Sequence, residues 1–126
     1  MVILDTSIII DHLRQTRGES RLMRLVKKMP KESLAISMVS IQELYEGKST
    51  KNKNKEQLLL ATIAPLKILP YSYEIAKLAG EIARDLKRPI EMADAVIAAT
   101  AIINRASLFT IDEKDFQGIE PLEIIK

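Results

Sequence analysis

The chain has 126 residues and a net charge of only +2, and 47% of its residues are hydrophobic although 4% are aromatic. This length and composition predict a single globular domain over residues 1–126 with an aliphatic core. The chain contains no cysteine, which excludes a disulfide framework, a thiolate zinc site and a cysteine nucleophile.

The alternation of short apolar runs with amphipathic segments predicts strands that alternate with helices. In chain order we expect a strand at 2–4, helices at 8–13 and 22–29, a strand at 34–37, a helix at 39–46, a strand at 66–69, helices at 75–86 and 92–103, and strands at 107–110 and 122–125. This order favours an α/β fold, with a mostly parallel sheet that helices cover on both faces.

Local signals define several of these boundaries. Thr6 or Ser7 is expected to cap the first helix, and Gly47 to stop the helix at 39–46. The polar stretch 48–55 is interpreted as a loop, and as the segment most prone to disorder. The helix at 92–103 is apolar around its whole circumference apart from Asp94 and Thr100, which is typical of a central buried helix.

The N-terminal residues show no basic leader and no apolar signal region, and no apolar run reaches the roughly 18 residues that span a bilayer. We therefore expect a cytoplasmic protein without a membrane partner. Positive charge gathers in two blocks, residues 14–31 and 48–55. Such blocks either follow the phosphates of a nucleic acid or form solvated helix faces.

Four carboxylates interrupt or end strongly apolar segments: Asp5, Glu43, Asp94 and Asp112. A charge in such a place costs several kcal/mol or becomes protonated unless it is compensated, and a shared divalent cation compensates several at once. Carboxylates without cysteine or histidine favour Mg²⁺ or Mn²⁺ over zinc. The predicted chemistry is hydrolysis of a phosphodiester by a water that the cation activates.

Each acid also has a purely structural interpretation. Asp5 and Asp112 can cap the helices that follow them, and Glu43 stands at capping-box spacing after Ser40. For Asp94, the helix dipole offers roughly 0.3–1 kcal/mol, which is less than the cost of burying its charge.

Other polar residues are assigned no site role. His12, the only histidine, is interpreted as a surface residue because it lies one helical turn beyond the strand end. The three tyrosines, Tyr45, Tyr71 and Tyr73, are expected to pack against the core with their hydroxyls in water.

Four segments together resemble the PIN-domain ribonucleases of the VapC type: residues 4–7 (LDTS), 40–44 (SIQEL), 93–101 (ADAVIAATA) and 108–116 (LFTIDEKDF). They occur in the family's order and spacing over nearly the whole chain. The resemblance implies a three-layer α/β/α sandwich and frequent homodimers. It also implies cleavage of RNA with Mg²⁺ or Mn²⁺, and inhibition of the toxin by an antitoxin partner.

Carried over by position, Asp5, Glu43 and Asp94 match the family's three acids, and Asp112 matches a fourth position that accepts Asp, Asn or Ser. Asp115 lies in the same segment and is an alternative to Asp112. The hydroxyl residues Thr6, Ser7 and Thr110 match small polar positions that support a carboxylate or a substrate phosphate.

Three other functions are alternatives for a chain of this length and pattern. A receiver domain needs an acid doublet after the first strand, where this chain has the single acid Asp5. A haloacid-dehalogenase-type phosphatase needs an acid at the position of Ser7. Both functions are therefore disfavoured. The remaining alternative is a PIN-like module that binds RNA or protein without catalysis, in which the basic blocks would carry the function.

Overall fold

The first strand already shows how the sheet is buried, because all three residues of β1 (Val2–Leu4) are inaccessible to solvent. Side chains of successive strand residues point to opposite faces, so Val2 and Leu4 contact one core cluster and Ile3 contacts another. A strand buried on both faces needs helices on both sides of the sheet. The structure is a computed structural model and describes residues 1–125.

One parallel sheet organises the described residues. Its strands are β1, β2 (Leu34–Ser37), β3 (Lys67–Leu69), β4 (Ser107–Phe109) and β5 (Ile124–Ile125), in the order β3-β2-β1-β4-β5. Every neighbouring pair is parallel, and Leu4 stands opposite Phe109 where β1 meets β4. The chain builds outward from β1 to β3 and then returns to the other side of β1. The carboxyl ends of β1 and β4 therefore form a topological switch point, where α/β sheets bind ligands.

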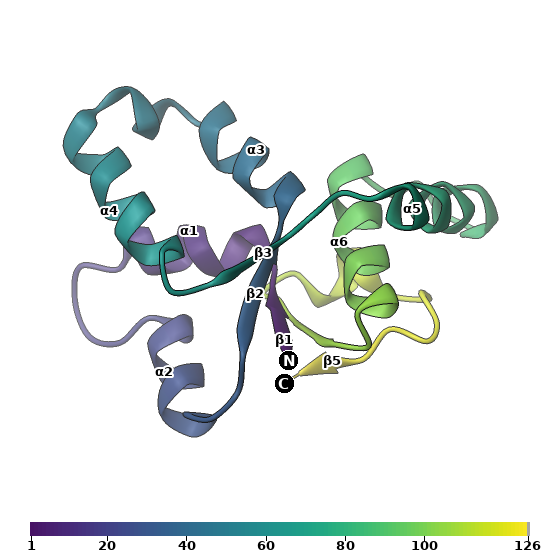
Figure 1. The fold of residues 1–126 in the computed structure, drawn as a ribbon, viewed down its shortest axis with the longest axis horizontal. Helices are drawn as coiled ribbons and strands as arrows, with labels where there is room; N and C mark the ends of the chain where they lie inside the picture. Colours follow the sequence, from purple (N-terminus) through teal and green to yellow (C-terminus); the bar gives the residue numbers. More distant parts are fainter. Residues whose placement is uncertain (126) are drawn as a thin grey trace.

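Helices form a layer on each side of this sheet (Figure 1). On one side, α1 (Thr6–Arg14), α2 (Arg21–Lys28) and α4 (Lys53–Ile63) pack with Val2, Leu4 and Ile36. On the other side, α6 (Met92–Ile103) packs on Ile3 and Leu108, and α5 (Tyr73–Asp85) packs on α6. The predicted three-layer α/β/α arrangement is confirmed.

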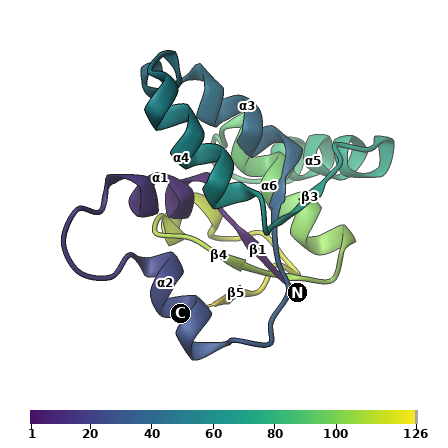
Figure 2. The ribbon, with the colours of Figure 1, turned by 60° about the vertical axis from the view of Figure 1, so that its left-hand side comes forward.

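Helix α3 (Met38–Glu46), the short 3₁₀ helix η1 (Lys48–Lys51) and α4 project together beyond the sheet (Figure 2). The prediction of a loop at 48–55 was therefore wrong. Asn52 caps α4 by accepting a hydrogen bond from the Lys55 amide at 3.1 Å. The sequence did not indicate this helix because its first turn is rich in lysine. The helix also buries only Leu59 and Ile63, so it has little apolar periodicity.

The helix at 92–103 is confirmed as central, since all residues from 95 to 101 are buried. The one hydroxyl among them, Thr100, donates to the Val96 carbonyl at 2.6 Å, so its burial leaves no donor unsatisfied. No helix within residues 1–125 combines the length and apolarity that crossing a membrane requires.

Candidate active site at the carboxyl ends of β1 and β4

Asp5 occupies the N-cap position of α1, yet its side chain makes no cap hydrogen bond. Its Oδ2 atom instead accepts hydrogen bonds from the hydroxyls of Ser7 and Thr110, both at 2.7 Å. Thr110 follows β4, whereas Asp5 follows β1, so the two adjacent strand ends meet at this carboxylate. The prediction that Thr6 or Ser7 caps the helix was wrong, and the carboxylate of Asp5 is not used as a cap either.

Burial raises the pKa of Asp5 above its ordinary value, and the negative charge of Asp112 raises it further. The hydrogen bonds from Thr110 and Ser7 act in the opposite direction, because they stabilise the charged form. The two hydroxyls therefore offset part of the effect of burial on Asp5, a residue that is only 5% exposed.

Glu43 reaches the site from α3 and is held by α1. The Thr6 hydroxyl donates to its Oε1 atom at 2.6 Å and also lies 2.8 Å from the hydroxyl of buried Ser40. Burial raises the pKa of Glu43, and the charges of Asp5, Glu46 and Glu91 add to this effect while the Thr6 hydrogen bond opposes it. The capping-box interpretation of Glu43 is not what the structure shows, since the cap of α3 is the hydroxyl of Ser37, which accepts from the Val39 amide.

Asp94 lies in the first turn of α6 and is partly buried. Burial is the main reason that its pKa rises from 3.8 to about 7, and the charges of Asp5, Asp115, Glu43 and Glu91 contribute the rest. Asp5, Glu43 and Asp94 come from three different elements and are far apart in the sequence. The structure brings all three into one negative field.

The segment after β4 carries both candidates for the fourth acid. Asp112 and Asp115 are exposed, the former at the N-cap of the 3₁₀ helix η2 (Glu113–Phe116) and without a side-chain cap bond. The negative charge of Asp112 raises the pKa of Asp5, and that of Asp115 raises the pKa of Asp94. The segment is fixed in place because the Asp112 amide donates to the Thr110 hydroxyl at 3.0 Å.

Two residues of this region were missed from the sequence. Glu91, three residues before Asp94, raises the pKa of both Glu43 and Asp94, and its i,i+3 spacing to Asp94 was the available signal. Arg88 donates to the carbonyls of Asp115 and Gln117 at 3.0 and 2.8 Å, and so anchors η2. No sequence pattern indicates that second role, because it depends on contacts 27 and 29 residues away.

The donor chemistry fits a hard divalent cation. Several carboxylates share one field, and the ion pairs found among residues 1–125 include none of Asp5, Glu43 and Asp94. In the described part of the chain, however, no three acidic or histidine side chains already form a group arranged to hold a metal. Holding one ion therefore requires side-chain rotation or water as a further ligand, and Mg²⁺ commonly keeps several waters.

Residues interpreted as structural lie outside this cluster. His12 Nδ1 lies 2.7 Å from the hydroxyl of buried Ser20, so this histidine is partly buried and supports α2 rather than standing free at the surface. The expectation of core-packed tyrosines was wrong, because Tyr45, Tyr71 and Tyr73 are 41%, 40% and 82% exposed.

Comparison with known proteins agrees with this architecture. The family model described as "PIN domain" matches residues 2–120. The chain belongs to the PIN domain family. It is 32% identical to Ribonuclease VapC10 of Mycobacterium tuberculosis, over 98% of this chain and 91% of that protein. It is 37% identical to Ribonuclease VapC1 of Rickettsia felis, over 71% and 73% of the two chains.

Solved structures show the same PIN fold. VapBC2 from Rickettsia felis, crystallised with a DNA fragment from its promoter, superposes with a TM-score of 0.86 at 25% identity, over 98% of this chain and 96% of that one. VapBC-1 from nontypeable Haemophilus influenzae gives a TM-score of 0.81 at 27% identity, over 99% and 96%.

Proposed function

We propose that this chain is an endoribonuclease that depends on Mg²⁺ or Mn²⁺ and acts as the toxin of a VapBC-type pair. The observation that carries the proposal is the cluster of Asp5, Glu43 and Asp94 at the switch point of the sheet. The charge of Asp5 raises the pKa of both Glu43 and Asp94, and the charge of Glu43 raises that of Asp94 further. The relatives named as VapC ribonucleases support RNA as the substrate.

In the proposed site, Asp5, Glu43 and Asp94 hold the cation, and Asp112 or Asp115 contributes from the edge. When bound, the cation lowers the pKa of a coordinated water and offsets negative charge on the phosphate. Ser7 and Thr110 orient Asp5 as a charged acceptor, and Thr6 orients Glu43. Such supporting hydrogen bonds fix the direction in which a ligand presents its oxygens.

Asp94 has a second consequence for the reaction. Because its pKa is about 7, this carboxyl is partly protonated near neutral pH, and ligation requires the ionised form. Activity at limiting metal should therefore rise with pH between about 6 and 8 as Asp94 loses its proton.

A labelled RNA tests the proposal directly. Cleavage is expected with Mn²⁺ or Mg²⁺, and is expected to stop in EDTA and in Asp94→Asn. The matched control is Asp85→Asn, which removes the same charge from an exposed aspartate that pairs with Arg84 at 2.7 Å on α5, and which should cleave like the wild type. RNA binding without fragments under any metal condition would favour the non-catalytic module.

Two partners complete the proposal. An antitoxin is expected because the similar solved structures are VapBC complexes. A groove of about 440 Å³ beside Glu43 offers a place for it, since its walls include Leu13, Leu44 and Leu58 from α1, α3 and α4. Co-expression with the neighbouring reading frame, followed by co-purification and loss of cleavage, tests this partner.

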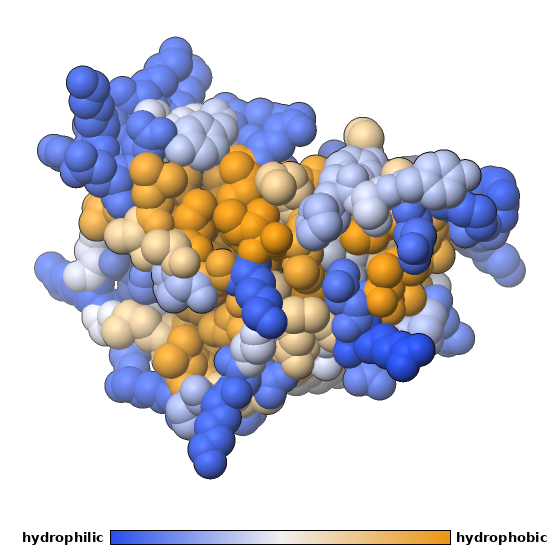
Figure 3. Space-filling view, in the orientation of Figure 1, coloured by the Kyte–Doolittle hydropathy of each residue, from blue (hydrophilic) through white to orange (hydrophobic). Residues whose placement is uncertain are grey.

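A homodimer is the second expected assembly. Apolar side chains gather over the face that displays α3, α4 and β3 (Figure 3). Exposed hydrophobic residues of these elements include Met38, Leu60 and Ile68, each more than two fifths exposed. Monomeric proteins rarely expose a large contiguous apolar patch, so light scattering at increasing concentration should show a dimer.

A further inference from the structure

A second groove opens between α2 and the carboxyl ends of β4 and β5. It encloses about 500 Å³, and its lining combines three cationic side chains with an apolar floor. The cations are Arg21, Arg24 and Lys28, and the floor includes Phe109 and Ile111. This volume lies within the range of small-ligand sites, and the mixture of cations and apolar surface is suited to a charged ligand with flat rings.

The three cations belong to one helix face, because their spacing is i, i+3 and i+7. Arg21 is ion-paired with Asp11 at 2.9 Å. The ion pairs among residues 1–125 include neither Arg24 nor Lys28. Within the described residues, neither of these two side chains is therefore engaged by a carboxylate, although one carboxylate, Glu113, also lines the groove.

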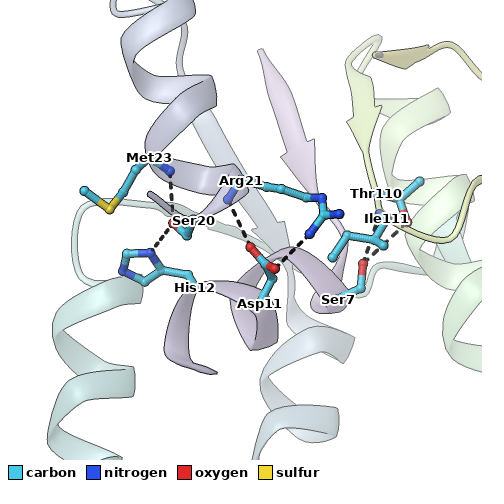
Figure 4. A network of polar contacts seen from close by, with 8 residues as sticks. All are labelled: Ser7, Asp11, His12, Ser20, Arg21, Met23, Thr110 and Ile111. Carbon is cyan, nitrogen blue, oxygen red and sulfur yellow. Dashed lines mark hydrogen bonds and ion pairs between the residues drawn. The ribbon is translucent and has the colours of Figure 1, made fainter. Parts of the chain in front are cut away.

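The cationic wall is held in position by contacts between α1 and α2 (Figure 4). Asp11 accepts from the backbone amide of Arg21 at 3.0 Å and from its guanidinium at 2.9 Å. The hydroxyl of Ser20 accepts from the Met23 amide at 3.2 Å and contacts His12 at 2.7 Å. These contacts fix the start of α2 and the side chain of Arg21, so less conformational entropy is lost there when the helix face binds a ligand.

The groove adjoins the acidic site at Thr110, which lines the groove and also donates to Asp5 Oδ2. The next residue, Ile111, contributes to the floor, and its amide donates to Ser7 at 3.3 Å. Figure 4 shows the Arg21 guanidinium directed toward Ser7 and Ile111. A strand that places a phosphate at the carboxylates can therefore continue into the groove.

We infer that this groove binds the RNA strand next to the phosphate that is cut. Arg24 and Lys28 contact backbone phosphates, while Phe109 and Ile111 receive a base or ribose. Cations attract phosphates without reading sequence, and apolar and aromatic surfaces accept the face of any base. The inference rests on the proposed function for the position of the cut phosphate beside the groove, but the binding itself does not require cleavage.

Binding is measured with Asp94→Asn, which prevents cleavage, and a short fluorescent single-stranded RNA in the presence of Mg²⁺. Each phosphate contact contributes about 0.7 to the slope of log affinity against log salt for a single strand. Arg24→Ala with Lys28→Ala should lower this slope by about 1.4 between roughly 50 and 200 mM salt. Arg24→Lys with Lys28→Arg, which keeps both charges, should restore most of it.

The matched control is Lys27→Ala on the same helix, because Lys27 pairs with Glu19 and does not line the groove. This variant should keep the original slope. In the cleaving protein, the double alanine variant should raise KM and leave kcat at saturating RNA nearly unchanged, and its thermal midpoint shows whether it is folded.

Each failure has its own signature. If the salt dependence of RNA affinity is unchanged in the double alanine variant, the groove does not bind RNA, even if the protein cuts RNA. Loss of slope in a protein that cuts no RNA with any cation supports the groove and overturns the nuclease. If RNA binding is unchanged but the double variant releases the protein encoded by the adjacent reading frame, the groove binds that protein, and the inference is wrong.

Discussion

Replacing Asp94 by asparagine should stabilise the metal-free protein at alkaline pH while it abolishes cleavage. Asparagine has nearly the shape of a protonated aspartate but carries no charge. At pH 8, Asp94 is ionised in a field that contains Asp5 and Glu43. Removing this charge therefore relieves both the burial cost and the repulsion.

The size of the effect follows from the pKa of Asp94, which rises from 3.8 to about 7 on folding. At about 1.4 kcal/mol for each pH unit, this change corresponds to an upper limit of about 4 kcal/mol. Because Asp94 is half-buried and water screens its interactions, we expect roughly half of that, about 2 kcal/mol.

The sign follows from which state holds the proton more tightly. The folded state does, so the stability that protonation of Asp94 confers is fully present below pH 3.8. It declines as pH rises through about 7 and then levels off. The advantage of Asp94→Asn should therefore be about 2 kcal/mol at pH 8, below about 1 kcal/mol at pH 5, and absent near pH 3.

Urea unfolding in EDTA at these pH values measures the effect, and a thermal scan at pH 8 should show a gain of roughly 5–10 °C. Asp85→Asn serves again as the control and should show no such gain. Added Mn²⁺ should stabilise the wild type more than Asp94→Asn, because binding to the folded state adds stability. A variant that is less stable than the wild type at pH 8 without metal would refute the reasoning.

Three further predictions concern the supporting residues. Thr6→Val removes the hydrogen bond that orients Glu43 and should weaken Mn²⁺ binding, measured by calorimetry, about 10- to 100-fold, whereas Thr6→Ser should bind normally. Asp115→Asn removes a charge that raises the pKa of Asp94, so a carboxyl NMR titration should find that pKa lower, and an unchanged titration would separate the two groups. Ser20→Ala deletes the cap of α2 and should cost about 1 kcal/mol in urea unfolding, with equal stability counting against the cap.

Several features followed from local chemistry and were correctly predicted. Apolar periodicity indicates which positions a strand or helix buries. It therefore predicted the alternation of strands and helices, the parallel sheet and the buried helix α6. The prediction of a loop at 48–55 was wrong because α4 buries only two side chains, so its polar sequence carries no periodic signal. The prediction that the tyrosines pack against the core was wrong for a related reason, since a single aromatic residue does not indicate whether it faces the core or the solvent.

The four acids were proposed as site residues from the sequence because a carboxylate beside apolar residues needs compensation and because they match positions in the family's segments. Their properties were decided by tertiary structure. The hydroxyls on Asp5 come from both ends of the chain, since Ser7 and Thr110 are separated by 103 residues. The raised pKa of Asp94 likewise depends on charges that only the folded chain places nearby. Sequence specifies which groups can ionise and which segments bury themselves, whereas distance between charges is set by packing, and electrostatic energy depends on that distance.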